Sequence, residues 1–431
     1  MDSTFHNQSL LFSPEDISKK HLQKYDLLLS NINVSPLKNH HQTKGRSPTP
    51  KDAILASLIY KTIRCIPTLS DLLRELNEHP NLAYKLGFIP SRQIPSVERL
   101  SSFLRDTPND TLQSIREDLV RKLIAAGEIS GKFVSTDSCP IAANVKENNL
   151  KTVVKERFDK TKITKGDPDA RLGVFVTFPS ESQKKISFFW GYKNHVVTDA
   201  VSELPISEIT RPANIHDSNL IIPQLTYLKN TFPLSMEAVI ADSAFDSAPI
   251  IEFIVKELDA KPVIARNPRG NQNTNLKISF KGAPICIAGF EMLSRGVFYD
   301  KSQNRTRHKF ICPITGSKKF AREVPICPWW HPKFLNGSGC ITYLRVDENI
   351  RQSIDYGSET FKKLYKLRVS SERIFSRLLS LCMQTPSVTG LNAVRNHCTI
   401  AHISILAIAL TAVRTDHRDK IRFVKTLFPN L

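Results

Sequence analysis

Residues 239–246 read VIADSAFD, an apolar run that stops abruptly at Asp242 and is followed shortly by Asp246. The run has the composition of a buried β-strand, and the SAPIIEFIVKELD that follows has the pattern of a helix. Removing a lone carboxylate from water is costly, so an acid at the end of a core strand needs a partner. Asp242 therefore either caps the following helix or binds a cation together with other acids.

A second apolar run, KFVSTD at residues 132–137, also ends on an acid, Asp137. Strand ends at one edge of a sheet lie close together, so Asp137 and Asp242 share a site if their strands are neighbours. A third acid, Glu372, lies in a segment with helical spacing over 358–383. Carboxylate oxygens are the ligands that Mg²⁺ and Mn²⁺ prefer, and two such ions support phosphodiester cleavage. The three acids therefore predict a metal site for that chemistry.

The composition favours a nucleic-acid partner. The 431 residues include 60 Lys and Arg against 41 Asp and Glu, a net charge of +19, and 41% hydrophobic residues suffice for a large core. The basic excess is concentrated in residues 261–323, with 13 basic against 3 acidic residues, and in residues 361–431, with 12 against 3. An anionic membrane surface is the rival partner. Because a merely solubilising surface mixes both signs, we expect two regions that face phosphate.

No stretch reaches the roughly 18–20 apolar residues of a membrane span. The nearest, residues 400–413, is shorter and contains His402, so we expect a buried helix there. The first residues lack a basic region followed by an apolar one, which predicts a cytoplasmic protein. Its eight cysteines are then expected to be reduced or metal-bound rather than paired.

Five segments of the chain differ in sequence pattern. Residues 1–50 end in polar, turn-rich sequence and are expected to form a flexible arm. Residues 51–130 have helical spacing and predict a helical domain for DNA binding or for dimerisation. Residues 131–266 alternate strands and helices, with two strands flanking a helix, and predict an α/β fold with some parallel pairing. Residues 267–358 contain short β-like pieces and predict a β-rich insertion, whereas residues 359–431 are predicted to be helical.

Several motifs together resemble a known family. They are STD at 135–137, GYKNH at 191–195, PANIHDS at 212–218, ADSAFDS at 241–247 and YKLRVSSE at 365–372. Their order and spacing resemble the DDE transposases of prokaryotic insertion sequences, in the group with a Tyr-two-Arg-three-Glu signature helix and a β-rich insertion before the Glu. The resemblance covers most of residues 50–415, including the helical amino-terminal region.

This resemblance implies a ribonuclease H-like mixed sheet with flanking helices, on which Asp137, Asp242 and Glu372 bind two Mg²⁺ or Mn²⁺ ions. It implies a transposase that binds the terminal inverted repeats of its mobile element, nicks the ends and joins the freed 3′-hydroxyls to target DNA. Handling two double-stranded ends at once implies a homodimer or larger assembly, which acts on the prokaryotic nucleoid in the cytoplasm and needs no membrane. The signature often continues with a basic residue where this chain has Leu379, and Arg373 or Arg377 would have to replace that phosphate contact.

Further residues are candidates for DNA contact. Tyr365 and Arg368 share a helix face with Glu372, because positions three and four apart are neighbours on a helix, and Arg suits a phosphate. Lys193 and His195 lie on one side of a predicted strand, and either reach the scissile phosphate or have a structural role. Other acids in the same motifs are expected to serve in turns and helix caps; they are Asp199, Asp217 and Asp246.

The predicted insertion carries two further patterns. Trp329 and Trp330 either stack on a DNA base that has left the duplex or, as we favour, belong to the core of the insertion. HKFIC and CPWWH each place a His and a Cys four residues apart, and the possible zinc ligands are His308, Cys312, Cys327, His331 and Cys340. A structural zinc site is the less favoured interpretation, because the usual two-residue spacing between cysteines is missing and free cysteines are often simply buried.

Two other functions fit the same sequence. A transposase-derived protein that represses by occupying its DNA sites is supported only by Leu379. A ribonuclease H-like repair nuclease would cut DNA without joining strands. For the acids, the alternative is a helix cap at Asp242, a turn acid at Asp137 and an ordinary Arg368–Glu372 ion pair, which would contribute only ~0.3 to 0.5 kcal/mol.

Overall fold

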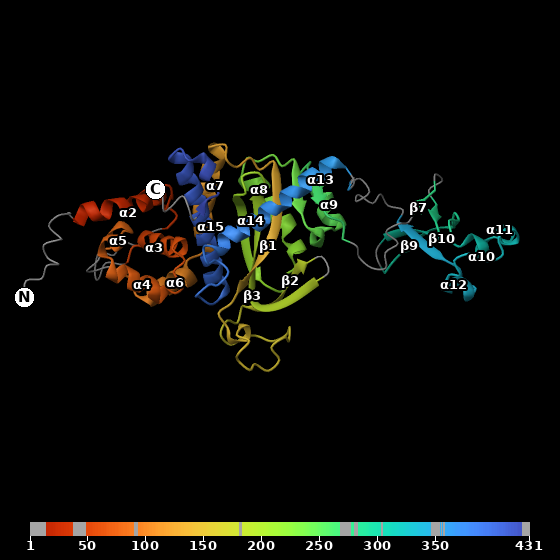
Figure 1. The fold of residues 1–431 in the computed structure, drawn as a ribbon, viewed down its shortest axis with the longest axis horizontal. Coiled ribbons are helices and arrows are strands. Elements are labelled where there is room, and N and C mark those ends of the chain that lie inside the picture. The colour runs from red at the N-terminus through yellow and green to blue at the C-terminus, as the bar shows by residue number, and fades with distance from the viewer. Residues whose placement is uncertain are drawn as a thin grey trace, which may run out of the picture. The chain divides into compact units, whose positions relative to one another are not determined.

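The computed structural model of the chain describes residues 14–37, 49–89, 94–180, 183–267, 277–279, 283–302, 305–345, 354, 356 and 358–424 (Figure 1). The chain divides into two compact units. The first consists of Met1–Phe245, Phe253–Ile264 and Glu359–Leu431, and the second of Asp246–Glu252 and Ala265–Ser358.

The first unit begins with helices. They are α2 (Pro14–Leu29), α3 (Lys51–Ile63), α4 (Leu69–Glu78), α5 (Pro80–Lys85), α6 (Val97–Asp106) and α7 (Asn109–Ala125). α4 begins after Thr68, whose side chain accepts a hydrogen bond from the Asp71 N–H at 3.0 Å, as a good N-cap residue does. It ends where His79 meets Pro80, because a proline cannot donate the hydrogen bond that would continue the helix.

Helix α2 corrects the prediction of a flexible arm over residues 1–50. The described chain continues after α2 to Leu37. The side chains of Tyr25, Leu28 and Ile32 are buried. These apolar positions are three and four residues apart, which is a helical spacing. The prediction of an arm gives more weight to the polar sequence that follows them. Residues 1–13 and 38–48 of the predicted arm lie outside the described residues.

A six-stranded mixed sheet follows the helices of the first unit. Its strands are β1 (Phe133–Ala142), β2 (Arg171–Ser180), β3 (Gln183–Asp199), β4 (Pro205–Pro212), β5 (Ala238–Ala241) and β6 (Lys261–Ile264). β3 pairs antiparallel with β1, β2 and β4, whereas β5 runs parallel to both β1 and β6. The parallel pairing predicted for the strands around α9 (Ala248–Lys256) is confirmed, and the chain is of the mixed α/β class.

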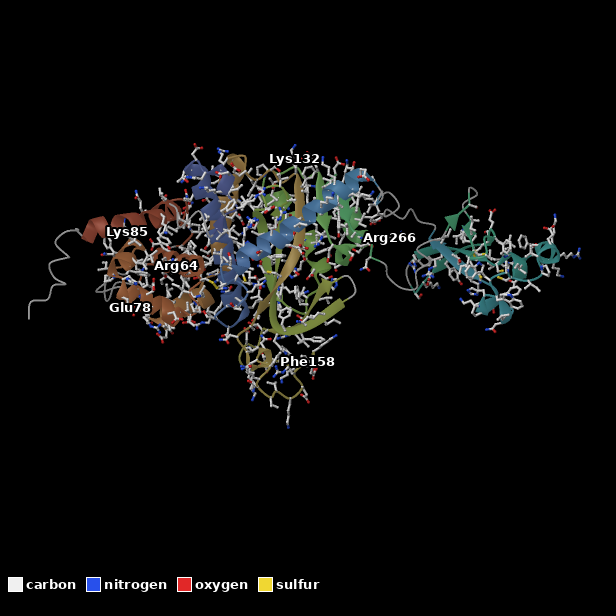
Figure 2. The ribbon with its side chains drawn as sticks, viewed as in Figure 1. Arg64, Glu78, Lys85, Lys132, Phe158 and Arg266 are labelled. Carbon is white, nitrogen blue, oxygen red and sulfur yellow. A yellow bond between two sulfur atoms is a disulfide. The ribbon has the colours of Figure 1, made fainter. Side chains whose placement is uncertain are left out.

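The long connection between β1 and β2 folds back onto β3. The indole N–H of Trp190 donates to the carbonyl of Arg157 at 2.8 Å, and the ring of Phe158 lies 5.3 Å from that of Phe188. Lys132, which immediately precedes β1, marks the edge at which this strand begins (Figure 2). The acids of interest lie toward the other edge, where the parallel strands end.

The signature segment is not the single helix predicted over 358–383. It forms α13 (Glu359–Tyr365), a 3₁₀ turn (Lys366–Arg368) and α14 (Val369–Leu379). α13 packs against β6, whereas α14 packs against β1 and β3 and crosses the sheet in front of β1 (Figure 1). The 3₁₀ turn allows the change of path between these two contacts, as such turns often do between helices.

The long helix α15 (Leu391–Arg414) is buried along most of its length and packs against α3, α6, α7 and β4. It is long and apolar enough to cross a membrane by length and composition, but most of its apolar stretch is covered by the protein itself. The buried helix predicted at residues 400–413 is therefore confirmed.

The second unit contains two small antiparallel sheets. Its strands are β7 (Lys277–Ile278), β8 (Pro284–Ile285), β9 (Leu293–Asp300), β10 (Arg305–Ile311) and β11 (Ile341–Arg345). Three short helices accompany them: α10 (Pro313–Gly316), α11 (Lys318–Glu323) and α12 (Pro332–Leu335). A small cluster of buried side chains, Cys312, Ile314 and Cys327, lies between these elements.

A disulfide joins Cys65, just after α3, to Cys382, just after α14, with the two Cα atoms 5.5 Å apart. The expectation that no cysteine is paired is therefore wrong for these two. They are 317 residues apart in the chain, so no local spacing in the sequence could indicate that they meet. The other six cysteines are free.

Candidate functional site

Asp137 and Asp242 occupy equivalent positions at the ends of two neighbouring parallel strands. The parallel pairing of β1 with β5 ends at the pair Ser135 and Ile240, and each aspartate follows two residues later, Asp137 within β1 and Asp242 directly after β5. β1 itself continues to Ala142 because its antiparallel partner β3 is longer, so Asp137 does not end its strand as predicted. It stands instead where the parallel pairing ends, which brings it beside Asp242.

Both aspartates resist carrying a negative charge in this position. Burial raises the pKa of Asp137 to about 7, and the charge of Asp242 adds to the rise, while the Ser138 N–H and Arg368 oppose it. Burial also raises the pKa of Asp242, and the hydrogen bond from the Ala244 N–H opposes this rise. The Ala244 N–H donates to Asp242 Oδ1 at 2.8 Å at the start of the short 3₁₀ helix Ser243–Phe245, a contact of the kind that the helix-cap alternative expects. Asp242 therefore makes a turn and belongs to an acidic group at the same time.

Glu372 reaches this region because α14 is fixed to β1 by hydroxyl groups. Ser135 Oγ of β1 lies 2.6 Å from Ser370 Oγ and 2.8 Å from Ser371 Oγ, and all three serines are buried. Glu372 follows directly, with a side chain that is 54% exposed. Arg368 donates to Glu372 Oε1 at 2.6 Å, so the predicted ion pair is present.

Arg368 connects Glu372 to the aspartates. Its positive charge lowers the pKa values of Asp137 and Asp242, and the charge of Asp137 in turn helps to raise the pKa of Arg368. Tyr365 packs against the buried cluster of the sheet, and its pKa is raised by burial and, less strongly, by the same three acids. Arg368 is thus the cation shared by the three predicted acids.

Asp217 also belongs to the group, although the sequence indicated only a helix cap. Its charge raises the pKa values of both Asp137 and Asp242. The cap of the short 3₁₀ turn Asp217–Asn219 is His216, whose side chain accepts from the Ser218 N–H, so the side chain of Asp217 is left for other partners. We call Asp137, Asp217, Asp242 and Glu372 the acidic site.

Lys193 and His195 approach the acidic site only through Asp217. Lys193 Nζ lies 3.0 Å from Asp217 Oδ1, and His195 Nδ1 lies 3.6 Å from the same oxygen. His195 of β3 pairs with Ser138 of β1, which is the residue after Asp137. Because successive side chains of a strand point to opposite faces, His195 and Asp137 lie on opposite faces of the sheet. Burial lowers the pKa of His195 to about 4, so this ring is neutral.

The basic residues of α14 have different surroundings. The side chain of Arg377 is 13% exposed and donates to a carboxylate oxygen and to the carbonyl of Glu203. Arg373 binds the same carboxylate at 2.6 Å but keeps most of its guanidinium in solvent. Leu379, at the end of α14, is exposed. Of the two proposed replacements for a basic residue at that position, Arg373 is the more accessible.

Three other predictions concern residues away from the acidic site. Trp329 and Trp330 are 65% and 61% exposed, so the favoured assignment of this pair to a core is wrong. Trp330 has a φ of 45°, which reflects a tight turn that directs the residue outward. Asp199 accepts hydrogen bonds from the N–H groups of Gly131 and Ser202 and so serves in a turn, as expected. Asp246 is buried and accepts from the Asn267 N–H.

The donor set of the acidic site fits a hard divalent cation. Its groups are carboxylates, and the raised pKa values of Asp137 and Asp242 show that these two need more positive charge than Arg368 supplies. Within the described ranges, no three His, Cys, Asp or Glu side chains are already arranged as ligands of one ion. Arg368 pairs with Glu372 instead, and a cation among the acids would compete with that pair.

Comparison with known proteins identifies the family of the chain. A family profile described as the transposase DDE domain matches residues 158–407, which include Asp242 and Glu372 and begin after Asp137. Among solved structures, a cryo-EM structure of a piggyBac transposase synaptic complex with hairpin DNA is similar, with 13% identity, 94% of this chain and 79% of that chain covered, and a TM-score of 0.36. The search of curated proteins gave no match. Because the family profile spans more than half of the chain, the chain belongs to the transposase DDE domain family.

Proposed function

We propose that this protein is a transposase that binds the terminal inverted repeats of its mobile element, cuts DNA strands there and joins them to target DNA. The observation that carries the proposal is the equal register of Asp137 and Asp242 where the adjacent parallel strands β1 and β5 stop pairing, with Glu372 of α14 linked to them through Arg368. The two aspartates stand where the parallel strands end, which is where open α/β sheets bind their ligands, and in the proposed site Glu372 joins them there.

The strand order supports a ribonuclease H-like catalytic domain. The spatial order is β2-β3-β1-β5-β6, with β4 also paired to β3, so that the antiparallel strands are continued beside β1 by the parallel strands β5 and β6. α14 covers β1 and β3 on the face that carries Ser135. We propose that the helices before β1 form the DNA-binding or dimerisation domain, and that the second unit corresponds to the β-rich insertion.

Asp137, Asp242 and Glu372 would hold two Mg²⁺ or Mn²⁺ ions. When bound, such ions would supply activation of the attacking hydroxyl and stabilisation of the leaving oxygen. The protein would position the DNA, keep the two aspartates ionised beside each other and release Glu372 from its pair with Arg368. The freed guanidinium of Arg368 would then be available to a phosphate, for which its planar fork is suited.

The accessible basic and aromatic side chains would contact the DNA. On α14, Arg373 exposes its guanidinium next to Glu372. In the second unit, Trp329 and Trp330 expose their indole rings, which could stack on a base displaced from the duplex. Because both regions belong to basic parts of the sequence, binding should weaken steeply as salt concentration rises.

The deciding experiment is a combined cutting and joining assay. A labelled duplex carrying the end of the element is incubated with an unlabelled target plasmid and Mg²⁺ or Mn²⁺. A transposase cuts at the end and transfers the label to the plasmid. Binding without cutting would favour the transposase-derived repressor, for which the exposed Leu379 is the supporting feature. Cutting without transfer of the label would favour a repair nuclease.

A further inference from the structure

Four cysteines of the second unit lie together although they come from distant parts of its sequence. They are Cys286, Cys312, Cys327 and Cys340, and all four are free thiols. The cluster of buried side chains in this unit contains Cys312 and Cys327, and Cys340 packs against it. Cys286 joins them through a tight turn, because its N–H donates at 2.9 Å to the carbonyl of Phe290, whose ring packs on the same cluster.

The backbone brings two of these cysteines into direct contact. The Cys312 N–H donates to the carbonyl of Cys340 at 2.8 Å, where β10 and β11 meet. Gly339 has a φ of 66°, and a Cβ at that position would come within 2.7 Å of the Cys312 Cβ. A glycine is therefore required beside Cys340 for the two strands to approach this closely.

Electrostatics agree with this grouping. Cys312, Cys286 and Cys327 all lie close enough to the Cys340 thiol for a charge on any of them to act on it. Four thiolates cannot share such a space unless a cation offsets their charge.

The two histidines named as possible zinc ligands have other roles. His308 Nε2 lies 2.6 Å from Ser294 Oγ, and its ring lies 4.3 Å from that of Phe310 in a tilted arrangement. His331 Nδ1 accepts from the Lys333 N–H at 3.2 Å and thereby caps α12. The sequence analysis named both histidines as possible ligands and did not name Cys286, which no short spacing connects to the others.

We propose that Cys286, Cys312, Cys327 and Cys340 form a structural four-cysteine zinc site that stabilises the second unit. The described residues hold no ready-made ligand set for a metal, so the four sulfur atoms must move inward on binding. In a tetrahedral site with Zn–S bonds of about 2.3 Å, the sulfur atoms stand roughly 3.8 Å apart. Rotation about a single side-chain bond in each cysteine moves its sulfur, and metal binding removes the thiol protons that oppose the approach.

The small size of the core explains why a metal is useful here. The second unit has short strands, and the side chains of β9 are mostly exposed, so little apolar area is buried. Units with small cores commonly depend on disulfides or a structural metal. Four free thiols without a disulfide among them favour the metal.

The test is the zinc content of the full-length protein after purification without chelators, measured by plasma mass spectrometry. We expect about one zinc per chain, and replacement by Co²⁺ should give the visible bands of tetrahedral cobalt bound to thiolates. Cys312→Ser and Cys340→Ser should lose the metal. Cys398→Ser, which changes a buried free cysteine of α15, and His308→Ala should keep it.

Several results would overturn the site. They are wild-type protein without zinc even after refolding in its presence, a cobalt spectrum without thiolate bands, a disulfide among the four cysteines in peptide mapping, or loss of zinc in His308→Ala. The cobalt spectrum of the wild type decides the question even if the cysteine variants fail to fold. Retention of zinc in Asp242→Ala separates this site from the acidic site.

Discussion

Glu203 should be the residue on which the position of α14 depends most strongly. It is 7% exposed, and its carboxylate binds Arg373, Arg377 and Arg422. Removing one partner of a buried ion pair costs about 3 to 5 kcal/mol, whereas exposed pairs contribute at most about 1 kcal/mol. Of these three ion pairs, only the pair with Arg377 consists of two largely buried side chains. Burial already lowers the pKa of Arg377 to about 10, and Glu203 opposes that shift.

The change to make is Glu203→Ala. Arg377 would keep its bond to the carbonyl of residue 203, so we expect a loss of about 3 kcal/mol in the free energy of unfolding, at the lower end of that range. The matched control is Arg422→Ala, which removes a partner that is 42% exposed and should cost about 1 kcal/mol or less. Urea denaturation of the full chain, followed by circular dichroism, measures both values.

A second measurement on the same proteins tests the link to function. α14 carries Glu372, so Glu203→Ala should also lower DNA cleavage at a temperature where the variant is still folded, while Arg422→Ala should cleave nearly normally. Equal and small losses of stability in the two variants would refute the argument that the buried pair holds α14. Full cleavage by a strongly destabilised Glu203→Ala would refute the link to Glu372.

Three further changes follow from the structure. Burial lowers the pKa of His402 to about 4, and its Nδ1 has no hydrogen-bond partner among the described residues. Because the folded pKa is below the unfolded value, the stability from this residue is complete above about pH 6.5 and falls by up to about 3 kcal/mol toward pH 4. Denaturation measured across that range should show a smaller fall in His402→Gln. Alanine at Trp329 or Trp330 should change stability by less than about 0.5 kcal/mol, because both rings are exposed. It should weaken the binding of unpaired DNA by ~1 to 3 kcal/mol per base. Titration with unpaired DNA measures this loss, with Phe158→Ala as the control variant. Reduction of the disulfide Cys65–Cys382 should lower the stability by about 2 to 4 kcal/mol, and peptide mapping without reductant should recover the linked peptides; an unchanged melting temperature with reductant would contradict this.

The sequence was sufficient to predict the two strands near the aspartates, because an apolar run followed by an acid is a local feature. It could not give the register, which depends on how β1 and β5 pair and which places Asp137 beside Asp242. It could not show that β1 continues beyond Asp137, because the length of β1 is set by its antiparallel partner β3.

The differences between prediction and structure have separate causes, and for Asp217 the cause is an interaction between residues far apart in the sequence. Asp217 has the composition of a cap, but its charge acts on Asp137 and Asp242, which come from other elements of the sheet. Trp329 and Trp330 were assigned to a core by residue type, although a small unit leaves such large rings exposed. In the amino-terminal region, the buried Leu28 and its neighbours were masked by the polar sequence that follows them.

The most direct test of the central claim is metal-dependent cleavage of a labelled duplex carrying the element end, with Asp137→Asn, Asp242→Asn and Glu372→Gln compared with the wild type. The control is Glu359→Gln, which neutralises an exposed carboxylate on α13 of the same segment. The account predicts that the wild type and the control cut only with Mg²⁺ or Mn²⁺, and that the three variants bind the duplex but do not cut it. Cleavage by any of the three at the wild-type rate would contradict the account, as would wild-type cleavage without a divalent metal.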